Sequence, residues 1–558
     1  MKLIVSLCRF LFIAAPLTWL QCTSPMAGGG TIETTNGAVA GIIVFPSGGP
    51  GYGTVVRLLP SNYDPVNDTG RSATATTDSL GRYRFSHVDS GDYIVEAIHA
   101  DNATRSIQAG IRVAGDTITA PTDTLRSPGS IKVTLPAGVD GATGYVYIPG
   151  TSHFAFLKNR IDFAMLDSAP AGLMPVINYS AKNSTEPTAI RYNVLVISGD
   201  TAIVGNPSWK YARTLFLNTS ATGANIAGDV TQFPILLRLN SGNFDFSQAK
   251  SNGADIRFAK NDNTPLPYEI ERWDPIAELA EVWVNVDTVH GNDSMQSIIM
   301  YYGNSNAADS SNGPAVFDTG AAFQGVWHFC EAGSAVAVDA TANHYDGTAY
   351  GMSDASSISG EVGKARAFDG ASSYITMPNT ANGKLNFPQD GNYTVCAWVS
   401  LDTLDGASHC IVSKGYGQYY LRSTYISMNF PLTTPMWEFV EFAEIGDMGN
   451  WRPSTSPAIS KQWTLLVGVR QGNRQLLYCN GVLVDDSVDV WQNKFSRTAN
   501  DLSIGKFLSE ITVPINEGFC FFKGSIDEVR ICSAARSPNW ILLCYMNQRT
   551  DDRLVRFK

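Results

Sequence analysis

Two adjacent acidic residues near the C-terminus are the first candidates for chemistry in this sequence of 558 residues. Asp527 and Glu528 lie in the apolar stretch GSIDEVRIC. Glycoside hydrolysis uses two carboxyl groups about 5 to 10 Å apart across the scissile bond. Successive side chains of a strand point to opposite faces, so these two acids diverge and do not form a catalytic pair. The same alternation predicts a solvated ion pair between Glu528 and Arg530, and a partly buried Asp527 beside Val529 and Ile531.

A buried carboxylate needs hydrogen-bond donors or a cation. Asp527 is therefore expected either to accept hydrogen bonds from backbone N–H groups or to bind Ca²⁺. The loop DATANHYDGT is a second calcium candidate, because Asp339, Asn343 and Asp346 offer the oxygen ligands that Ca²⁺ prefers. An ordinary Asx turn is the alternative interpretation of this loop. Structural Ca²⁺ is the one cofactor that the sequence suggests.

Aromatic side chains in the C-terminal third are candidates for carbohydrate binding, because the apolar face of a pyranose stacks on an aromatic ring. Each could equally be a core residue. The candidate ligand-binding residues are Tyr416, Tyr419, Trp437, Trp451 and Arg452.

Catalysis is not expected. In the acidic run WEFVEFAEIGD, Glu438 and Glu444 share one face of a strand while Glu441 points the other way, so no pair of carboxylates converges. The sequence also contains no G-x-S-x-G, H-E-x-x-H or C-x-x-C motif. Binding without chemistry is therefore the expected activity.

The composition indicates an all-β protein of several domains. The chain has 44% hydrophobic and 16% charged residues with 50 Gly and 27 Pro, which suits many short strands joined by turns. At about 150 residues per domain, its length predicts about four domains. The net charge of -11 without a basic run argues against nucleic acid as a partner.

The N-terminus predicts export. Residues 1–21 have the basic start and short apolar segment of a signal peptide. The following Cys22 resembles the acylated cysteine of bacterial lipoproteins, which implies a lipid anchor in the membrane and a linker over residues 22–35. Cleavage near Ala27 is the alternative. The expected location is the bacterial cell surface or outer membrane, or secretion.

Seven of the nine cysteines lie between Cys330 and Cys544, and export permits up to three disulfides among them. Cys396 in YTVCAWV and Cys479 in LLYCNGV instead occupy positions typical of buried thiols.

The repeated spacing of strands and turns separates the chain into β-domains. The run TTDSLGRYRFSHVDSGDYIVEA resembles carboxypeptidase regulatory-like domains, which implies a β-sandwich over 36–125. A weaker repeat of it is expected over 128–205. Residues 207–318 resemble the bacterial domain of unknown function DUF2341 through Trp273, Trp283, Tyr301, Tyr302 and Gly303.

Residues 320–558 resemble laminin-G-like, concanavalin A-like jelly rolls through FQGVWHF, GKARAFDGASSYITM and GSIDEVRI. The predicted fold is a series of tandem β-sandwiches that ends in this jelly roll. We expect a non-catalytic cell-surface protein whose jelly roll recognises a glycan or another surface protein. A purely structural or adhesive protein and a concanavalin A-like glycoside hydrolase are the alternatives.

Overall fold

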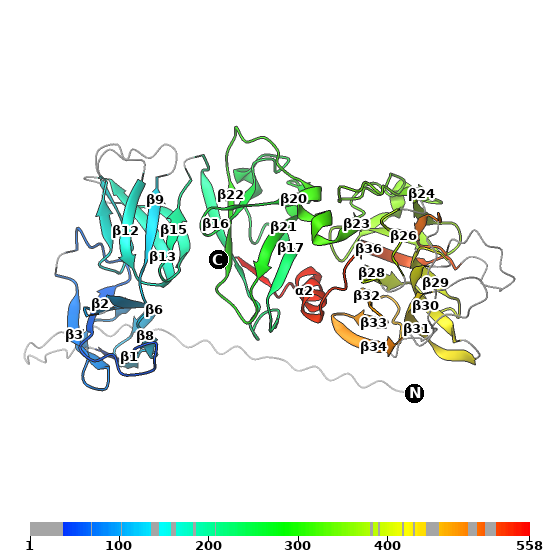
Figure 1. Ribbon diagram of the computed structural model, residues 1–558. Helices are drawn as coiled ribbons and strands as arrows, with labels where there is room; N and C mark the ends of the chain where they lie inside the picture. The colour runs from blue at the N-terminus through cyan, green and yellow to red at the C-terminus, as the bar shows by residue number, and fades with distance from the viewer. Residues whose placement is uncertain are drawn as a thin grey trace, which may run out of the picture.

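Strands dominate the structure, a computed structural model shown in Figure 1. It describes residues 37–557 except for short segments. The excepted positions are 69, 102, 136–143, 158–162, 182–185, 207, 380–382, 389–390, 416–417, 428–429, 442–456, 489–498 and 508–519. Strands account for 52% and helices for 5%, so the predicted all-β fold is confirmed. Among the described residues, no helix has the length and apolar character needed to cross a membrane. The predicted signal peptide and Cys22 lie outside the described residues.

The first domain is a sandwich of two sheets around a core that includes Tyr83 and Phe85. The sheets have the orders β4-β1-β7, with β8 also paired to β1, and β3-β2-β5-β6. The strands are β1 (Gly37–Val44), β2 (Val55–Pro60), β3 (Ala73–Thr76), β4 (Arg82–Val88), β5 (Gly91–His99), β6 (Thr104–Val113), β7 (Thr117–Thr119) and β8 (Asp123–Thr124).

The second domain is also a sandwich, with sheets of order β11-β10-β13-β14 and β12-β9-β15. It contacts the first domain through a hydrogen bond of 2.5 Å from the Tyr145 hydroxyl to Asp64 Oδ2. The strands are β9 (Gly129–Thr134), β10 (Gly144–Tyr147), β11 (Phe154–Phe156), β12 (Phe163–Ala169), β13 (Gly172–Ala181), β14 (Thr188–Val196) and β15 (Thr201–Val204). The resemblance of these two domains to carboxypeptidase regulatory-like domains stays a prediction.

The third domain packs a five-stranded sheet, β19-β18-β22-β16-β37, against a three-stranded sheet, β17-β21-β20. Its elements are β16 (Tyr211–Leu217), β17 (Val230–Asn240), η1 (Phe246–Gln248), β18 (Arg257–Lys260), β19 (Pro265–Leu266), β20 (Tyr268–Asp274), β21 (Leu279–Val289), β22 (Ser297–Tyr302) and α1 (Gly313–Val316). The remaining strand, β37 (Val555–Phe557), comes from the C-terminus of the chain.

The fourth domain is the jelly roll. Its larger sheet has the order β25-β26-β36-β28-β32-β33-β34, with β23 also paired to β36, and its smaller sheet has the order β24-β27-β35-β29-β30-β31. The elements are η2 (Thr319–Ala321), β23 (Phe323–Trp327), β24 (Thr348–Tyr350), η3 (Asp354–Ser356), β25 (Ser357–Ser359), β26 (Lys364–Asp369), β27 (Tyr374–Met377), β28 (Tyr393–Leu401), β29 (His409–Ser413), β30 (Tyr419–Ser427), β31 (Phe430–Glu441), β32 (Thr464–Gln471), β33 (Arg474–Cys479), β34 (Val482–Val488), β35 (Leu502–Ile504) and β36 (Lys523–Cys532).

The larger sheet of the jelly roll is buried on both faces. In β28, Val395 and Ala397 pack into the core between the two sheets, whereas Cys396 and Trp398 pack into a second core that includes residues of the third domain. Because both faces of the sheet are buried, β28 has the sequence YTVCAWVSL, with apolar residues at nearly every position. The third domain covers the outer face of this sheet.

The C-terminus returns to the third domain and joins it to the jelly roll. Helix α2 (Pro538–Gln548) begins at Ser537, whose side chain accepts a hydrogen bond from Trp540 N, as the sequence Ser-Pro predicts. The Asn547 side chain accepts from Leu236 N at 2.7 Å and donates to Leu236 O at 3.0 Å, so it covers the outer edge of β17. Strand β37 then pairs with β16 beside the C-terminus (Figure 1).

No disulfide joins the cysteines within the described part of the chain, so the expected disulfides are not observed there. Cys396 and Cys479 are buried, as the alternative interpretation predicts. Cys396, Cys532 and Cys544 all belong to the core between the third domain and the jelly roll. These thiols behave as small apolar side chains.

Candidate functional site

The aromatic residues predicted to bind carbohydrate belong to the core where the structure describes them. Tyr419 is 0% exposed and Trp437 is 1% exposed. The Tyr419 ring packs at 5.2 Å from the ring of Tyr393 and at 5.7 Å from that of Phe387. Neither ring can offer a face to a sugar, so the expected binding role of these two residues is wrong. Tyr416, Trp451 and Arg452 lie outside the described residues.

Glu438, the first glutamate of the acidic run, also faces the interior of the jelly roll. Glu438 lies opposite Arg422 across strands β30 and β31, and Arg422 Nε donates to its Oε2 at 2.7 Å. Both side chains are buried. This pair holds the smaller sheet together, and Glu444 lies outside the described residues.

The predicted calcium loop forms hydrogen bonds of its own. Asp339 is buried, and its carboxylate accepts from the backbone N–H groups of Val326, Thr341 and Tyr345 at 2.9 to 3.0 Å. Asn343 Oδ1 accepts from Lys384 Nζ at 2.7 Å, and Asp346 Oδ1 accepts from Asp339 N at 2.9 Å. This is the geometry of the Asx-turn interpretation. Calcium at this loop stays a prediction.

Asp527 occupies the anchoring position expected as the alternative to a calcium ligand. Its Oδ2 accepts a hydrogen bond of 2.9 Å from Val362 N, which ties β36 to the loop before β26. Burial, followed by the charge of Glu528, raises the pKa of Asp527 well above its usual value. Calcium at Asp527 likewise stays a prediction.

Two register shifts direct a pair of glutamates into the space between the third domain and the jelly roll. In β20, Glu271 is the extra residue at a shift between Ile270 and Arg272. In β36, Val529 and Glu528 together oppose a single residue of β28, and Glu528 has a left-handed backbone with φ 49°. A bulge of this kind re-aims a side chain, and bulges are frequent beside functional sites.

Glu528 and Arg530 form the predicted ion pair, but the prediction that this pair is solvated is wrong. Arg530 Nη2 donates to Glu528 Oε2 at 2.6 Å, but both side chains are at most 1% exposed. Regular strand alternation places them at the surface, whereas the bulge and the third domain enclose them.

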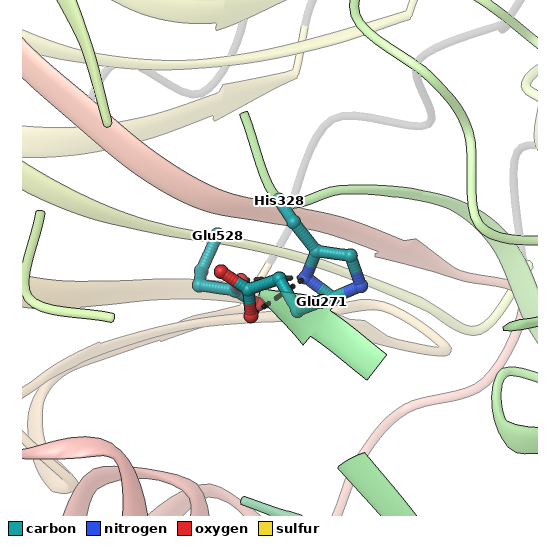
Figure 2. A group of neighbouring side chains, drawn as sticks. All are labelled: Glu271, His328 and Glu528. Atoms are coloured by element: carbon teal, nitrogen blue, oxygen red, sulfur yellow. Dashed lines mark hydrogen bonds and ion pairs between the residues drawn. The ribbon is translucent and has the colours of Figure 1, made fainter. Parts of the chain in front are cut away.

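His328 lies at the centre of this buried group, directly after β23 (Figure 2). Its Nδ1 is 2.6 Å from Glu528 Oε1 and 3.8 Å from Glu271 Oε2, and its Nε2 is 3.5 Å from Glu269 Oε2. The Trp283 indole lies parallel to the imidazole, with ring centroids 5.6 Å apart, and its N–H donates to Glu271 Oε2 at 2.8 Å. We call Glu271, His328 and Glu528 the interdomain triad.

Burial and mutual charge shift the acidity of all three groups of the triad. Burial, followed by the charge of Glu528, raises the pKa of Glu271 to about 8. Burial opposes the protonation of His328, but the carboxylates of Glu528 and Glu269 outweigh it and raise the His328 pKa well above its usual value. Burial disfavours the Glu528 carboxylate, yet His328 and Arg530 lower its pKa overall. At neutral pH Glu528 is thus a carboxylate and His328 a protonated imidazolium.

A second feature, at the smaller sheet of the jelly roll, is a group of aromatic rings that is partly exposed. Tyr350 of β24 lies opposite Tyr374 of β27, and their rings stack with centroids 4.8 Å apart and planes 11° apart. Lys506 Nζ lies 4.4 Å from the Tyr374 ring centroid and 5.0 Å from that of Phe521. Tyr350 is 44% exposed. We call these four residues the tyrosine surface.

Sequence reasoning found neither feature. The triad unites residues from positions 271 to 528, and no local motif connects them. The tyrosine surface depends on the register between two short strands. One signal was available for it, because Tyr374 alternates with the apolar residues Ile375 and Met377, which pack into the core.

The fold defines a multidomain β-protein that ends in a concanavalin A-like jelly roll. Residues 369–542 match the family described as the concanavalin A-like lectin/glucanases superfamily, Laminin_G_3. Residues 252–329 match the domain of unknown function DUF2341. The resemblances to both families that the sequence suggested are confirmed, and the triad draws residues from both matched segments.

No curated protein matches the sequence. Among solved structures, the chain is similar to domain 4 of AbnA, an extracellular arabinanase from Geobacillus stearothermophilus, in complex with arabinotriose. The two sequences are 19% identical, the TM-score is 0.29, and the match covers 40% of this chain and 97% of that one. It is also similar to the binding domain of Paraclostridial Mosquitocidal Protein 1, with 12% identity, a TM-score of 0.30 and coverage of 40% and 52%. The botulinum neurotoxin serotype D binding domain gives 12% identity, a TM-score of 0.27 and coverage of 40% and 51%. The chain spans about half the length of these two binding domains.

Proposed function

We propose that the protein is a non-catalytic, exported surface protein whose jelly roll binds carbohydrate at the tyrosine surface. The observation that carries this proposal is the exposed Tyr350 ring, which stacks on the half-buried ring of Tyr374. The apolar face of a sugar ring packs on an aromatic ring, while its hydroxyl groups need polar partners around the edge. Tyr350 offers the ring, since Tyr374 covers only one of its faces.

The surroundings of the tyrosine surface fit a polyhydroxylated ligand. Ser372 and Asp369 lie in the exposed turn that precedes Tyr374, and the Ser372 hydroxyl donates to Asp369 Oδ2 at 2.6 Å. The turn approaches Tyr350 closely, because Ser373 Oγ donates to Gly351 O at 2.9 Å. The Ser372 hydroxyl and the Asp369 carboxylate thus place polar atoms beside the rings.

The packing of the domains favours the smaller sheet of the jelly roll as the place where a ligand binds. The third domain and α2 cover the outer face of the larger sheet, so a ligand of any size meets the smaller sheet instead. The carboxylates that a hydrolase would need are engaged internally: Glu438 pairs with Arg422, and Glu528 pairs with His328 and Arg530. These pairings support binding without hydrolysis.

The proposal includes a lipid anchor at Cys22, which would hold the two N-terminal sandwiches and the jelly roll at the cell surface. A Cys22→Ser variant that stays membrane-bound would contradict the anchor. Carbohydrate binding by the jelly roll does not depend on it.

A glycan array with the full exported chain tests the binding proposal, and arabinotriose belongs on it. We expect a specific signal that Tyr350→Ala weakens at least about tenfold, as loss of one aromatic stacking partner implies. Tyr52→Ala is the matched control, since Tyr52 is 65% exposed in the first domain. Its signal should equal that of the wild type.

Three outcomes would contradict the proposal. They are the absence of any glycan signal, an equal loss in both tyrosine variants, and the release of reducing sugar from a bound glycan. The last outcome would favour the glycoside hydrolase, and the first would favour the structural or adhesive protein.

A further inference from the structure

The interdomain triad presents nitrogen and oxygen ligands from two domains at one point. One ligand atom from each of its three residues lies within 4.8 Å of the others, and all three side chains are buried. Divalent transition metals bind such atoms at about 2.0 to 2.2 Å, which separates neighbouring ligands by about 3.3 Å. The distances of 2.6 and 3.8 Å from His328 Nδ1 to the Glu528 and Glu271 oxygens lie on either side of this value. Side-chain shifts of less than about 1 Å would therefore admit an ion.

The charges around the triad favour a divalent cation. Five carboxylates gather here, whereas the positive groups are two guanidinium groups and one imidazole. Even with His328 protonated, negative charges exceed positive ones by two. Unpaired charge is costly in a buried site, so the excess must be balanced by protons or by a cation. The five carboxylates belong to Glu269, Glu271, Glu281, Asp527 and Glu528, and the positive groups to Arg272, His328 and Arg530.

Unpaired oxygen atoms point to the same conclusion. In the described part of the chain, Glu271 Oε1 and Asp527 Oδ1 are buried and accept no hydrogen bond. Buried polar atoms are almost always paired, and an exception calls for a missing ion or water. Gly363 carries no side chain at this point, and a Cβ there would lie 2.4 Å from Glu271 Oε1.

Each member of the triad also has a partner of the kind that supports a metal ligand. The far nitrogen of His328 faces Glu269 Oε2 at 3.5 Å, which is the carboxylate–histidine arrangement found behind metal-bound imidazoles. The Trp283 indole N–H donates to Glu271, and Arg530 donates to Glu528 Oε2, leaving Glu528 Oε1 directed at His328 Nδ1. The three ligand side chains are therefore already oriented.

We propose that Glu271, His328 and Glu528 bind a divalent transition-metal ion of the Zn²⁺ class between the third domain and the jelly roll. His328 Nδ1 and the two carboxylates are the ligands. The ion replaces protons held by the imidazole and by Glu271, and these protons pass to the solvent. The metal fixes the jelly roll on the third domain, and the site is independent of the proposed carbohydrate binding.

Metal titration of the full chain tests this site. After dialysis against EDTA, ZnCl₂ is titrated by calorimetry at pH 8, and CoCl₂ gives the absorption spectrum of the coordinated ion. We expect one equivalent of Zn²⁺ to bind with a dissociation constant below about 1 µM. Weaker binding by the wild-type protein overturns the proposal and leaves the triad as a proton-balanced ion pair network.

Substitutions in and around the triad test whether the metal ion binds there. Glu271→Gln keeps the side-chain shape and the acceptor for Trp283, so it should fold and yet weaken Zn²⁺ binding at least about 100-fold. Glu269→Gln, behind the imidazole, should weaken it about 10- to 100-fold. His290→Ala is the control, because His290 forms an exposed pair with Asp229. Wild-type affinity in Glu271→Gln, or an equal loss in His290→Ala, overturns the assignment.

Discussion

Asn547 of α2 is one of the residues through which the C-terminal helix contacts the third domain, and its replacement by alanine tests that contact. The side chain pairs with both backbone polar groups of Leu236, which is 0% exposed. In Asn547→Ala the N–H and the C=O of Leu236 lose their partners in a site closed to water. Each buried unpaired group costs about 1 to 3 kcal/mol. The better helix propensity of alanine returns about 0.5 kcal/mol, so the net loss of stability should be about 2 to 5 kcal/mol.

Tryptophan fluorescence during urea unfolding measures this loss selectively. Ten of the eleven tryptophans lie between Trp209 and Trp540, and the other is Trp19 in the predicted signal peptide. The signal therefore reports the third domain and the jelly roll without the two N-terminal sandwiches. With a urea dependence of about 3 kcal/mol per molar, the midpoint should fall by about 1 M.

Asn539→Ala is the matched control, because Asn539 stands in the first turn of the same helix and is partly exposed. Its midpoint should stay close to that of the wild type. Equal midpoints for Asn547→Ala and Asn539→Ala would refute the reasoning, since they would mean that the helix does not hold the two domains together. The docking also implies that a fragment of residues 320–558 lacks part of its core partner, so binding studies need the third domain as well.

Two further predictions concern the buried charges. Glu528→Ala leaves a buried imidazole and a buried guanidinium without their carboxylate, so the free energy of unfolding measured in urea should fall by about 3 to 5 kcal/mol. Asp486→Ala, the control, breaks an exposed pair with Arg474 and should lower it by less than about 1 kcal/mol. Similar losses of stability in the two variants would contradict the burial of the Glu528 group. Because the pKa of Glu271 is raised from 4.5 to about 8, the folded state holds a proton that the unfolded state releases, and stability in EDTA should fall as pH rises from 4.5 to 8. Glu271→Gln should remove about 1.4 kcal/mol per pH unit of that slope, and an unchanged slope would exclude Glu271 as its source.

The alternation of apolar residues predicted the strands well, because a side chain's face in a regular strand depends only on its neighbours in sequence. It failed at Glu528, where a bulge and a left-handed backbone turn the side chain into the molecule. It also left open whether Tyr419 and Trp437 face the core or a ligand. That choice depends on which sheet packs on their strand, and the structure places both in the core.

By itself, the sequence determined the all-β class, the DUF2341 and concanavalin A-like regions, and the helix that begins after Ser537. These follow from composition, local periodicity and capping chemistry. Only the tertiary structure decided that the last twenty residues return to the third domain, that Glu271, His328 and Glu528 meet between two domains, and that Tyr350 stacks on Tyr374. Such contacts join residues far apart in the chain, and their geometry depends on strand register and domain packing, which no local pattern encodes.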